Sequence, residues 1–369
     1  MHPLIIRAYE DGGNPRADSD IIRTENGFLL RPFNEDGDTS YKFHINAEIV
    51  NPTDRAIETD ITIEWFTNEH PQLRDHMQLH SEGDVLTWIP AAASGTRQSA
   101  TVTVPPGAHC LCMNPRYPLA RLHALLDGLD KSVFTVKTIG KTRMNRDFHA
   151  IEAGNPDAPV MAIIARVYPY ETVSSFCIEG ILEWLSGAEG AAFLRNHRLA
   201  VIPMANPDGV WLGNHKTTYG GMNLGGNMVQ SMEPEAVAIR DYFTGLNPRL
   251  LADLRGWLAR YDDSVIDGWL NRCGDAMKTN SIARGPAVYA AMIPHSEGIN
   301  MEYIDPAGYA RQDGMGGMLL DRCGTDYVTA TWTHRGRNIE QMKTLGVVFL
   351  QAAAGETTME QWREGFSNE

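Results

Sequence analysis

The sequence predicts an α/β protein with a mixed, largely parallel sheet flanked by helices, preceded by an antiparallel β-sandwich. Residues 1–115 consist of short alternating apolar and polar segments separated by turn residues, a pattern typical of sandwich strands. From about residue 131, near-continuous apolar runs alternate with helical patterns, which is typical of buried parallel strands joined by helices. We therefore expect a sandwich domain over 1–115, a linker helix over 116–130 and an α/β domain over 131–369.

The expected sandwich strands are defined by alternation and by the turns between them. The segments YKFHINAEIVN (41–51) and AIETDITIEWF (56–66) alternate, and Asn51-Pro52-Thr53-Asp54 separates them as a turn. A third segment, SATVTVPPGAHCLCM (99–113), alternates on both sides of Pro105-Pro106-Gly107. Several short strands at this spacing are typical of an antiparallel β-sandwich.

The expected α/β elements follow one another in regular order. Buried strands are predicted within 158–168, 197–210 and 247–257, where apolar runs end in polar or aromatic residues. Helices are predicted over 171–187, 233–246, 337–355 and 357–366, where apolar residues recur at helical spacing.

Composition restricts the classes of function. The chain has 369 residues, of which 43% are hydrophobic, so it can bury a large core. The formal net charge of -14 disfavours nucleic acid and anionic membranes as partners. No apolar run is long enough to cross a bilayer. The five cysteines include no Cys-x-x-Cys pair, so we expect reduced, buried thiols and a cytoplasmic location.

A ligand site is expected where the buried strands end. In open α/β sheets, ligands bind beyond the carboxyl ends of the strands. Three such ends carry polar or aromatic residues, at 168–171, at 206–227 and at 253–256. We expect these three segments to converge on one crevice.

Four motifs follow one another in this region: ARVYPYETVSSFCIEGILEWLSG, VIPMANPDGVWLGNHKTTYGGMNLGGN, EPEAVAIRDYF and ADLRGW. In sequence, order and spacing they resemble those of the M14 zinc carboxypeptidases, and particularly the cytosolic carboxypeptidase branch. The resemblance covers roughly residues 131–350 and implies the carboxypeptidase fold. It also implies that the β-rich N-terminal region is the sandwich domain that precedes the peptidase in the cytosolic branch.

The same resemblance locates the family's zinc ligands on three positions of this chain. Tyr168 stands at the first His position, Glu171 at the Glu position and Arg255 at the later His position. A protonated tyrosine is a poor zinc ligand, and arginine is a permanent cation without a free lone pair. We therefore expect no family-type zinc site and no cofactor, unless other side chains supply displaced ligands. A bidentate ion pair between Glu171 and Arg255 would take the metal's place.

The family's substrate-binding positions are altered as well. The Asn-Arg pair that grips a terminal carboxylate falls on Gly225-Gly226, and the Arg that polarises the scissile carbonyl falls near Lys216. The general base aligns with Thr333, next to His334.

Nine side chains are site candidates on these grounds. The candidates for catalysis are Tyr168, Glu171, Arg255 and His334, and those for substrate binding are Tyr170, His215, Lys216, Asn223 and Asn227. Each also has a structural interpretation: aromatic packing for the tyrosines, solvation on a glycine-rich loop for His215 and Lys216, and turn formation for the asparagines.

Three functions remain open, together with a purely structural or partner-binding role. The first is a pseudoenzyme whose cationic crevice binds a carboxylate-bearing small molecule, peptide or acidic saccharide. The second is a divergent metallocarboxypeptidase or amidohydrolase with displaced ligands, and the third is a metal-free lyase acting on uronate-containing polysaccharide. The sequence leaves open whether the chain is an enzyme, and it does not indicate an oligomeric state.

Overall fold

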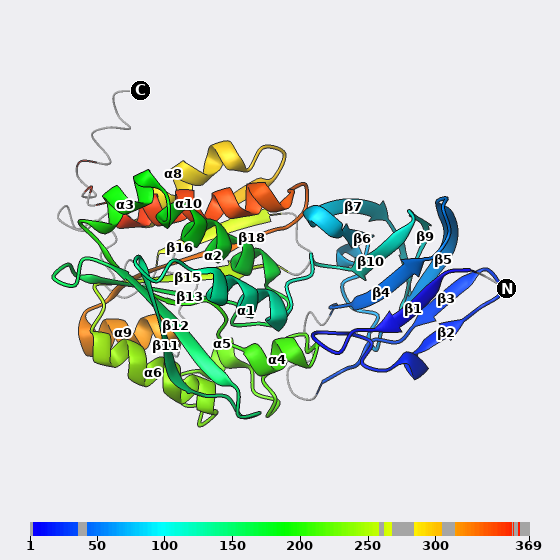
Figure 1. The fold of residues 1–369 in the computed structure, drawn as a ribbon, viewed down its shortest axis with the longest axis horizontal. Coiled ribbons are helices and arrows are strands. Elements are labelled where there is room, and N and C mark those ends of the chain that lie inside the picture. Colours follow the sequence, from blue (N-terminus) through cyan, green and yellow to red (C-terminus); the bar gives the residue numbers. More distant parts are fainter. Residues whose placement is uncertain are drawn as a thin grey trace.

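Two β-sheets form the N-terminal part of the molecule, and a larger sheet with helices forms the rest (Figure 1). The computed structural model describes residues 3–35, 43–257, 262–267, 284–304 and 314–355, together with residues 357 and 361. Within these residues the N-terminal sheets have five strands each and the third sheet has eight.

The first N-terminal sheet is antiparallel throughout. Its strands are, in spatial order, β1 (Ile5–Ala8), β4 (Asn46–Asn51), β10 (Gly107–Cys112), β6 (His76–Ser81) and β7 (Val85–Pro90). The second contains, in order, β2 (Ile21–Arg23), β3 (Gly27–Leu30), β5 (Ile57–Glu64), β9 (Arg97–Val104) and β8 (Ala92–Ser94). One pair departs from the expected antiparallel pattern, because β3 runs parallel to β5. Short 3-10 turns occur at η1 (Asp18–Asp20), η2 (Pro71–Leu73) and η3 (Glu82–Asp84).

Alternation along each strand produces the core between these two sheets. Ile61 and Ile63 of β5 are fully buried, as are Ala47 and Ile49 of β4. Such a buried isoleucine contributes roughly 1.5–3 kcal/mol relative to an exposed one. The turns expected after Asn51 and around Pro105 lie where predicted, between β4 and β5 and between β9 and β10.

The eight-stranded sheet is parallel at its centre. Its spatial order is β11 (Phe134–Lys141), β12 (Asp147–Gly154), β14 (Arg198–Ile202), β13 (Val160–Ala165), β15 (Leu250–Gly256), β18 (Asp326–Trp332), β16 (Asp262–Asp267) and β17 (Asn300–Ile304). The run from β14 through β13 and β15 to β18 is parallel, and so is the pair β16–β17. The other three pairs are antiparallel.

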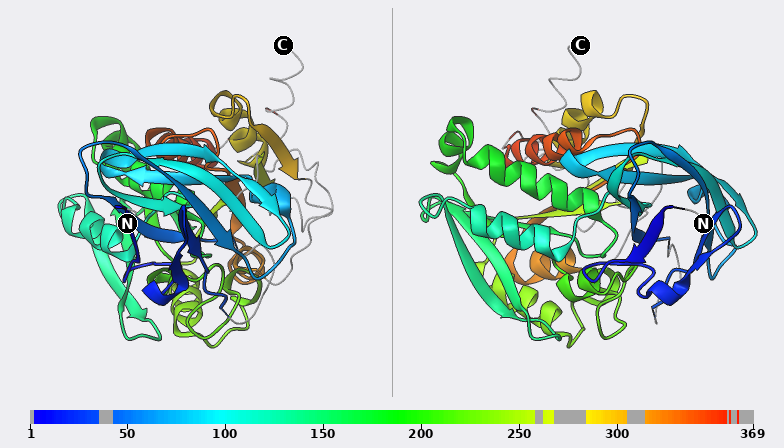
Figure 2. Two further views of the ribbon diagram at one scale, coloured as in Figure 1. Left: turned by 90° about the vertical axis from the view of Figure 1, so that its right-hand side faces the viewer. Right: turned by 45° about the vertical axis from the view of Figure 1, so that its right-hand side comes forward.

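Helices cover both faces of this sheet (Figures 1 and 2). One face packs against α1 (Leu119–Gly128), α2 (Thr172–Leu185), α8 (Arg284–Met292) and α10 (Ile339–Ala354). The other packs against α6 (Pro234–Leu246) and α9 (Met315–Cys323). The shorter elements are α3 (Ala188–Leu194), α4 (Pro207–Trp211), α5 (Leu224–Asn227) and η4 (Ile293–His295).

Residue size sets the distance between α2 and α10. A Cβ on Gly180 of α2 would lie 2.4 Å from the carbonyl oxygen of Lys343 in α10, and one on Gly346 would lie 2.2 Å from that of Cys177. Larger residues would force the helices apart, so both glycines permit backbone contact between them. This close packing holds α2, and with it the start of the helix at Glu171, against the sheet.

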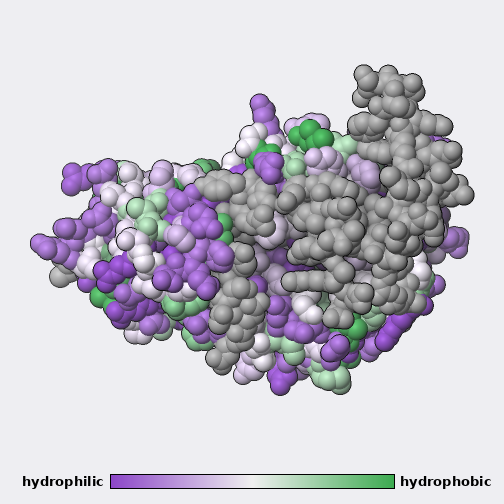
Figure 3. All heavy atoms as spheres, turned by 180° about the vertical axis from the view of Figure 1, so that it is seen from behind, coloured by the Kyte–Doolittle hydropathy of each residue, from purple (hydrophilic) through white to green (hydrophobic). Residues whose placement is uncertain are grey.

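The predicted fold class is confirmed by this architecture. The predicted helix over 357–366 lies almost entirely outside the described residues, and the domain division at residues 115 and 130 stays a prediction. Seen from behind, the described surface is mainly hydrophilic with isolated hydrophobic residues, in keeping with the net charge of -14 (Figure 3). Among the described residues, no helix has the length and apolar character needed to span a membrane.

Candidate functional site

The three predicted strand ends are brought together by the order of the sheet. Strand β13 lies between β14 and β15, and all three are parallel, so their carboxyl ends share one edge. Tyr168 and Glu171 follow β13, and Glu171 is the N-cap residue of α2. Arg255 lies near the end of β15, on the neighbouring strand. The expected convergence on one site is therefore present for these segments.

Glu171 and Arg255 form an ion pair as predicted, but through one guanidinium nitrogen and not with the bidentate geometry expected. Arg255 Nε donates to Glu171 Oε1 at 2.7 Å, and the carboxylate's second oxygen accepts the backbone N–H of Tyr168 at 2.9 Å. Glu171 is buried, and only 14% of the Arg255 side chain is exposed. A carboxylate buried in this way loses its hydration, so its charged form is stable only while the partner cation is present.

Burial and charge act against each other within this cluster. Burial raises the pKa of Glu171, while the charge of Arg255 and the hydrogen bond from Tyr168 oppose that rise. Burial also raises the pKa of Asp253, whose Oδ2 lies 3.7 Å from Arg255 Nη1. For Arg255, burial disfavours the cation, but attraction to Glu171 and Asp253 outweighs it and raises the pKa of the guanidinium.

The Tyr168 ring lies at the centre of the site and is in contact with two cations. The guanidinium carbon of Arg255 is 4.6 Å from the ring centroid and Lys216 Nζ is 5.3 Å from it. The Tyr170 ring is 5.6 Å away, so the two tyrosines pack as expected. The hydroxyl lies against Gly225, where a Cβ would be only 2.6 Å from the phenol oxygen.

These residues do not fit a zinc ion. The three aligned positions supply one carboxylate, one phenol and one guanidinium, and the carboxylate is already bonded to the guanidinium at 2.7 Å. A catalytic zinc site needs about three neutral or anionic protein donors, and a structural site needs four. Across the described parts of the chain, no cluster of three or more His, Cys, Asp or Glu side chains is arranged to hold a metal.

The interpretation of His215 and Lys216 as solvated side chains on a glycine-rich loop is wrong. The His215 side chain is fully buried and both ring nitrogens are hydrogen bonded. Its Nδ1 accepts the backbone N–H of His44 and its Nε2 donates to the Phe33 carbonyl, both at 2.8 Å. Lys216 is buried as well, and its backbone N–H donates to Glu35 Oε1 at 2.7 Å. The N-terminal segment therefore encloses this loop, and His215 positions it.

Asn223 and Asn227 form the turn that their structural interpretation predicts. Asn223 is the N-cap of α5, where its Oδ1 accepts the Gly226 N–H at 3.1 Å. The Asn227 side chain reaches back to the Asn223 carbonyl at 3.4 Å. Their contribution to substrate binding stays a prediction.

The candidate base region lies beneath the surface. Thr333 and His334 are fully buried, and His334 Nε2 lies 3.4 Å from His76 Nε2. His76 stacks on Trp88 with ring centroids 4.0 Å apart, which places His334 at the contact with β6 and β7. A catalytic role for His334 stays a prediction, and the structure shows it packed between the two parts of the molecule.

One buried pair near this region was not foreseen. Asp263 and Arg337 are both buried and form a bidentate ion pair, with Arg337 Nη1 donating to Asp263 Oδ1 at 2.8 Å. Asp263 Oδ1 also accepts the Thr333 N–H at 2.9 Å. The pair therefore supports the turn after β18 that carries Thr333. The sequence has no local pattern that would predict this pair, because 74 positions separate Asp263 from Arg337.

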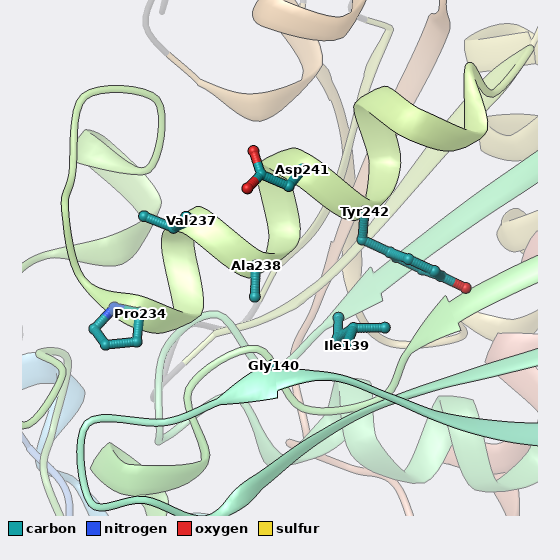
Figure 4. Close-up of a pocket in the computed structure, with 7 residues that line it drawn as sticks. All are labelled: Ile139, Gly140, Pro234, Val237, Ala238, Asp241 and Tyr242. Carbon is teal, nitrogen blue, oxygen red and sulfur yellow. The ribbon is translucent and has the colours of Figure 1, made fainter.

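A separate groove lies between β11 and α6 (Figure 4). Its volume is about 440 Å³ and it shares no residue with the cluster around Tyr168. Its lining consists of Ile139, Gly140, Pro234, Val237, Ala238, Asp241 and Tyr242. No residue of this groove was a site candidate in the sequence.

The fold, with altered side chains at the strand ends, is that of a carboxypeptidase-like α/β protein. Comparison with known proteins supports this class. Residues 122–255 match the Peptidase_M14 family model, described as zinc carboxypeptidase. The resemblance to M14 zinc carboxypeptidases predicted from the motifs is therefore confirmed.

Curated relatives belong to the cytosolic carboxypeptidases. Cytosolic carboxypeptidase 6 of Mus musculus is 32% identical over 120 residues, which is 29% of this chain and 22% of that protein. Cytosolic carboxypeptidase 2 of Danio rerio is 38% identical over 95 residues, or 25% of this chain and 13% of that protein. The matched segment thus covers about a fifth or less of these relatives.

Solved structures share the fold over nearly the whole chain. A metallo-carboxypeptidase from Burkholderia cenocepacia has a TM-score of 0.77 at 18% identity, covering 95% of this chain and 98% of that one. A metallo-carboxypeptidase from Pseudomonas aeruginosa, in complex with (2-guanidinoethylmercapto)succinic acid, has a TM-score of 0.76 at 16% identity and covers 94% and 97%.

Proposed function

We propose that this M14-like protein binds a carboxylate-bearing ligand and does not hydrolyse peptides with zinc. The observation that carries the proposal is the ion pair between Glu171 and Arg255, with a Nε–Oε1 distance of 2.7 Å, at two of the three aligned ligand positions. The guanidinium supplies the positive charge that zinc would otherwise bring beside Glu171. A divalent cation entering there would be repelled by Arg255.

The ligand class is proposed from the cations around Tyr168. Lys216 and Arg255 both contact the Tyr168 ring, and arginine and lysine bind carboxylates by charge-assisted hydrogen bonds. The Pseudomonas aeruginosa structure was solved with a succinic acid derivative, which supports a carboxylate as the group to test. A small molecule, a peptide terminus and an acidic saccharide each carry this group.

Metal analysis tests the first half of the proposal. Protein purified without chelator is dialysed against micromolar zinc, and bound metal is measured by mass spectrometry alongside release of C-terminal residues from peptides. We expect neither bound zinc nor release. About one zinc per chain that is removed together with activity would overturn the proposal and favour a divergent metallocarboxypeptidase.

Matched ligands test the second half. Calorimetry compares a peptide bearing a free C-terminal carboxylate with the same peptide as its amide, and a uronate oligosaccharide with its neutral counterpart. We expect binding only of the acidic member of at least one pair, and weaker binding to the variant Lys216→Met. Equal binding of both members of each pair would contradict a carboxylate site.

A cytoplasmic location is part of the same proposal. Cys110, Cys112 and Cys177 are free and buried, which suits a reducing compartment. The curated relatives carry the word cytosolic in their names. Fractionation of cells that express the full chain tests this location, and recovery with secreted protein would contradict it.

A further inference from the structure

A small enclosed cavity lies where the N-terminal sheets meet the α/β part, and neither Glu171 nor Arg255 is among the residues that line it. Its lining comes from both parts and includes Asp11, His44, Asn46, Arg116, Arg166 and Pro169. The space accommodates about one species of the size of a water molecule or a chloride ion. Three of the lining side chains, those of His44, Arg116 and Arg166, are cationic or have a buried donor without an acceptor among the described residues.

The first is His44, whose tautomer follows from its neighbours. Asn46 Nδ2 donates to the Gly12 carbonyl at 3.3 Å, and Cys110 Sγ donates to Asn46 Oδ1 at 3.6 Å, so the amide orientation is defined. The same amide nitrogen lies 3.1 Å from His44 Nε2, which must therefore accept. The ring proton is on Nδ1, and this buried donor has no acceptor among the described residues.

The second is Arg116. Its Nη2 donates to the Asp11 carbonyl at 2.8 Å, and its guanidinium lies 3.9 Å from the centroid of the Tyr9 ring. Its Nε is buried and, within the described part of the chain, has no hydrogen-bond acceptor. A buried donor without an acceptor costs about 1–3 kcal/mol.

The third is Arg166, a buried cation held only by neutral groups. It donates to the Pro169 carbonyl at 2.7 Å, to Ser175 Oγ at 2.9 Å and to the Tyr117 carbonyl at 3.3 Å. Burial lowers the pKa of this guanidinium to about 10, so it is charged at neutral pH. A buried cation is ordinarily paired with an anion. The charges of Glu171 and Asp11 act on Arg166, but no carboxylate among the described residues lies within ion-pair distance of it.

We propose that this cavity is a binding site for one small monovalent anion of about the size of chloride. His44 Nδ1–H and Arg116 Nε–H donate to the anion, and Arg166 supplies charge. Asp11 also lines the cavity, but its two carboxylate oxygens accept the N–H groups of Leu119 and Ala120 at 3.0 and 2.8 Å. Among the residues that line the cavity, two guanidinium groups accompany one carboxylate, while Glu171, whose charge also acts on Arg166, is paired with Arg255. The lining therefore has one excess positive charge, which a monovalent anion neutralises and a water molecule does not.

Bromide locates the anion directly. Crystals of the full chain grown in sodium bromide are measured at the bromine absorption edge. We expect an anomalous peak inside the cavity, within hydrogen-bonding distance of His44 Nδ1 and Arg116 Nε. Ordinary water density there with no anomalous signal would overturn the proposal, and would show that a neutral molecule satisfies the same donors.

Thermal unfolding tests the site in solution. Sodium chloride and sodium gluconate are compared at equal ionic strength, since gluconate is too large for the cavity. We expect a saturable rise in Tm of about 2 °C or more that is specific to chloride. Arg116→Lys, which keeps the charge but removes the Nε donor, should lose this chloride-specific rise.

The matched control is Arg143→Lys, since Arg143 pairs with Glu233 and its side chain is 48% exposed. This control should respond to chloride as the parent does. Equal Tm values in chloride and gluconate, or a full chloride response in Arg116→Lys, would contradict the site. If Arg116→Lys does not fold, the bromide experiment and the anion comparison on the parent still decide.

Discussion

The phenol of Tyr168 occupies the space into which any side chain at position 225 would project. A Cβ on Gly225 would lie 2.6 Å from the Tyr168 oxygen and 2.8 Å from the carbon that carries it. The resemblance places the family's zinc-binding His at position 168 and the Asn of its carboxylate clamp at position 225. The two departures from the family pattern are therefore sterically linked, since the tyrosine requires the glycine.

This contact predicts that Gly225→Ala destabilises the protein by about 1–3 kcal/mol, because the added methyl group overpacks the site. Gly226→Ala is the control within the same short helix, where the nearest atom would be 3.7 Å away. It should be neutral or slightly stabilising, since alanine favours helix. Urea unfolding of both variants, and of Gly225→Ala combined with Tyr168→Ala, measures the coupling. Equal effects of the two alanines would refute the steric link.

The ion pair predicts a large cost for removing one partner. Arg255→Met should destabilise the protein by about 3–5 kcal/mol, because Glu171 is left buried without a counter-charge. Combining it with Glu171→Gln should recover part of that loss. Arg31→Met is the control, since Arg31 forms an exposed ion pair with Glu64 and should cost about 1 kcal/mol or less.

The cost of Arg255→Met should also depend on pH. The folded-state pKa of Glu171 is already raised by burial, and losing Arg255 raises it further. A carboxyl whose folded-state pKa is raised stabilises the fold at low pH and loses that contribution as pH rises through it. The deficit of the variant should therefore be smaller at pH 5 than at pH 8 in urea unfolding. A deficit that grows toward low pH would show that Glu171 is not the affected group.

Zinc binding should appear when both altered ligands are restored. Tyr168→His together with Arg255→His would place two imidazoles beside Glu171, the donor set that catalytic zinc uses. We expect about one zinc per chain in the double variant after equilibrium dialysis, and none in the parent or either single variant. Zinc retained by Tyr168→His alone would mean that Arg255 does not oppose the metal.

Glu235 predicts a second pH effect, away from the site. Burial raises its pKa from 4.5 to about 7, with the charges of Asp208 and Glu233 adding to the rise. Its contribution to stability is complete below about pH 4.5 and is lost as pH rises through 7. Glu235→Gln should therefore gain stability over the parent at pH 8, by about 3 kcal/mol at most, and little at pH 5.

Unfolding in urea at the two pH values checks this gain. Glu340→Gln provides the control, since 81% of that side chain is exposed and it should change little at either pH. A gain for Glu235→Gln that is equal at pH 5 and pH 8 would show that Glu235 does not titrate in this range.

Local pattern was sufficient to predict the elements that carry the site. The apolar run before Tyr168 becomes β13, and the helical spacing after it becomes α2. The contact between Glu171 and Arg255 spans 84 positions and was expected from the resemblance, which places both residues at zinc-ligand positions of the family. The strand and helix predictions depend on local spacing, whereas this contact depends on the fold that the resemblance implies.

Long-range contacts account for what could not be predicted. The burial of His215 results from His44 and Phe33, which lie 171 and 182 positions away. Likewise, no pattern in the residues around Asp263 predicts that their strand pairs antiparallel with β18, or that Asp263 pairs with Arg337. Such contacts depend on how the N-terminal sheets and the late segments of the chain pack, which no local spacing encodes.

The place of β18 in the eight-stranded sheet has a consequence for biosynthesis. Strand β18 (Asp326–Trp332) is synthesised late, but in the sheet it lies between two earlier strands, β15 and β16. While the ribosome is still making residues 257 to 325, β15 has been synthesised but its partner along that edge has not. An unpaired apolar strand edge is open to association with other chains. This edge of β15 therefore lacks its native partner until β18 has been synthesised, which makes that interval the one in which the edge is open to wrong pairing.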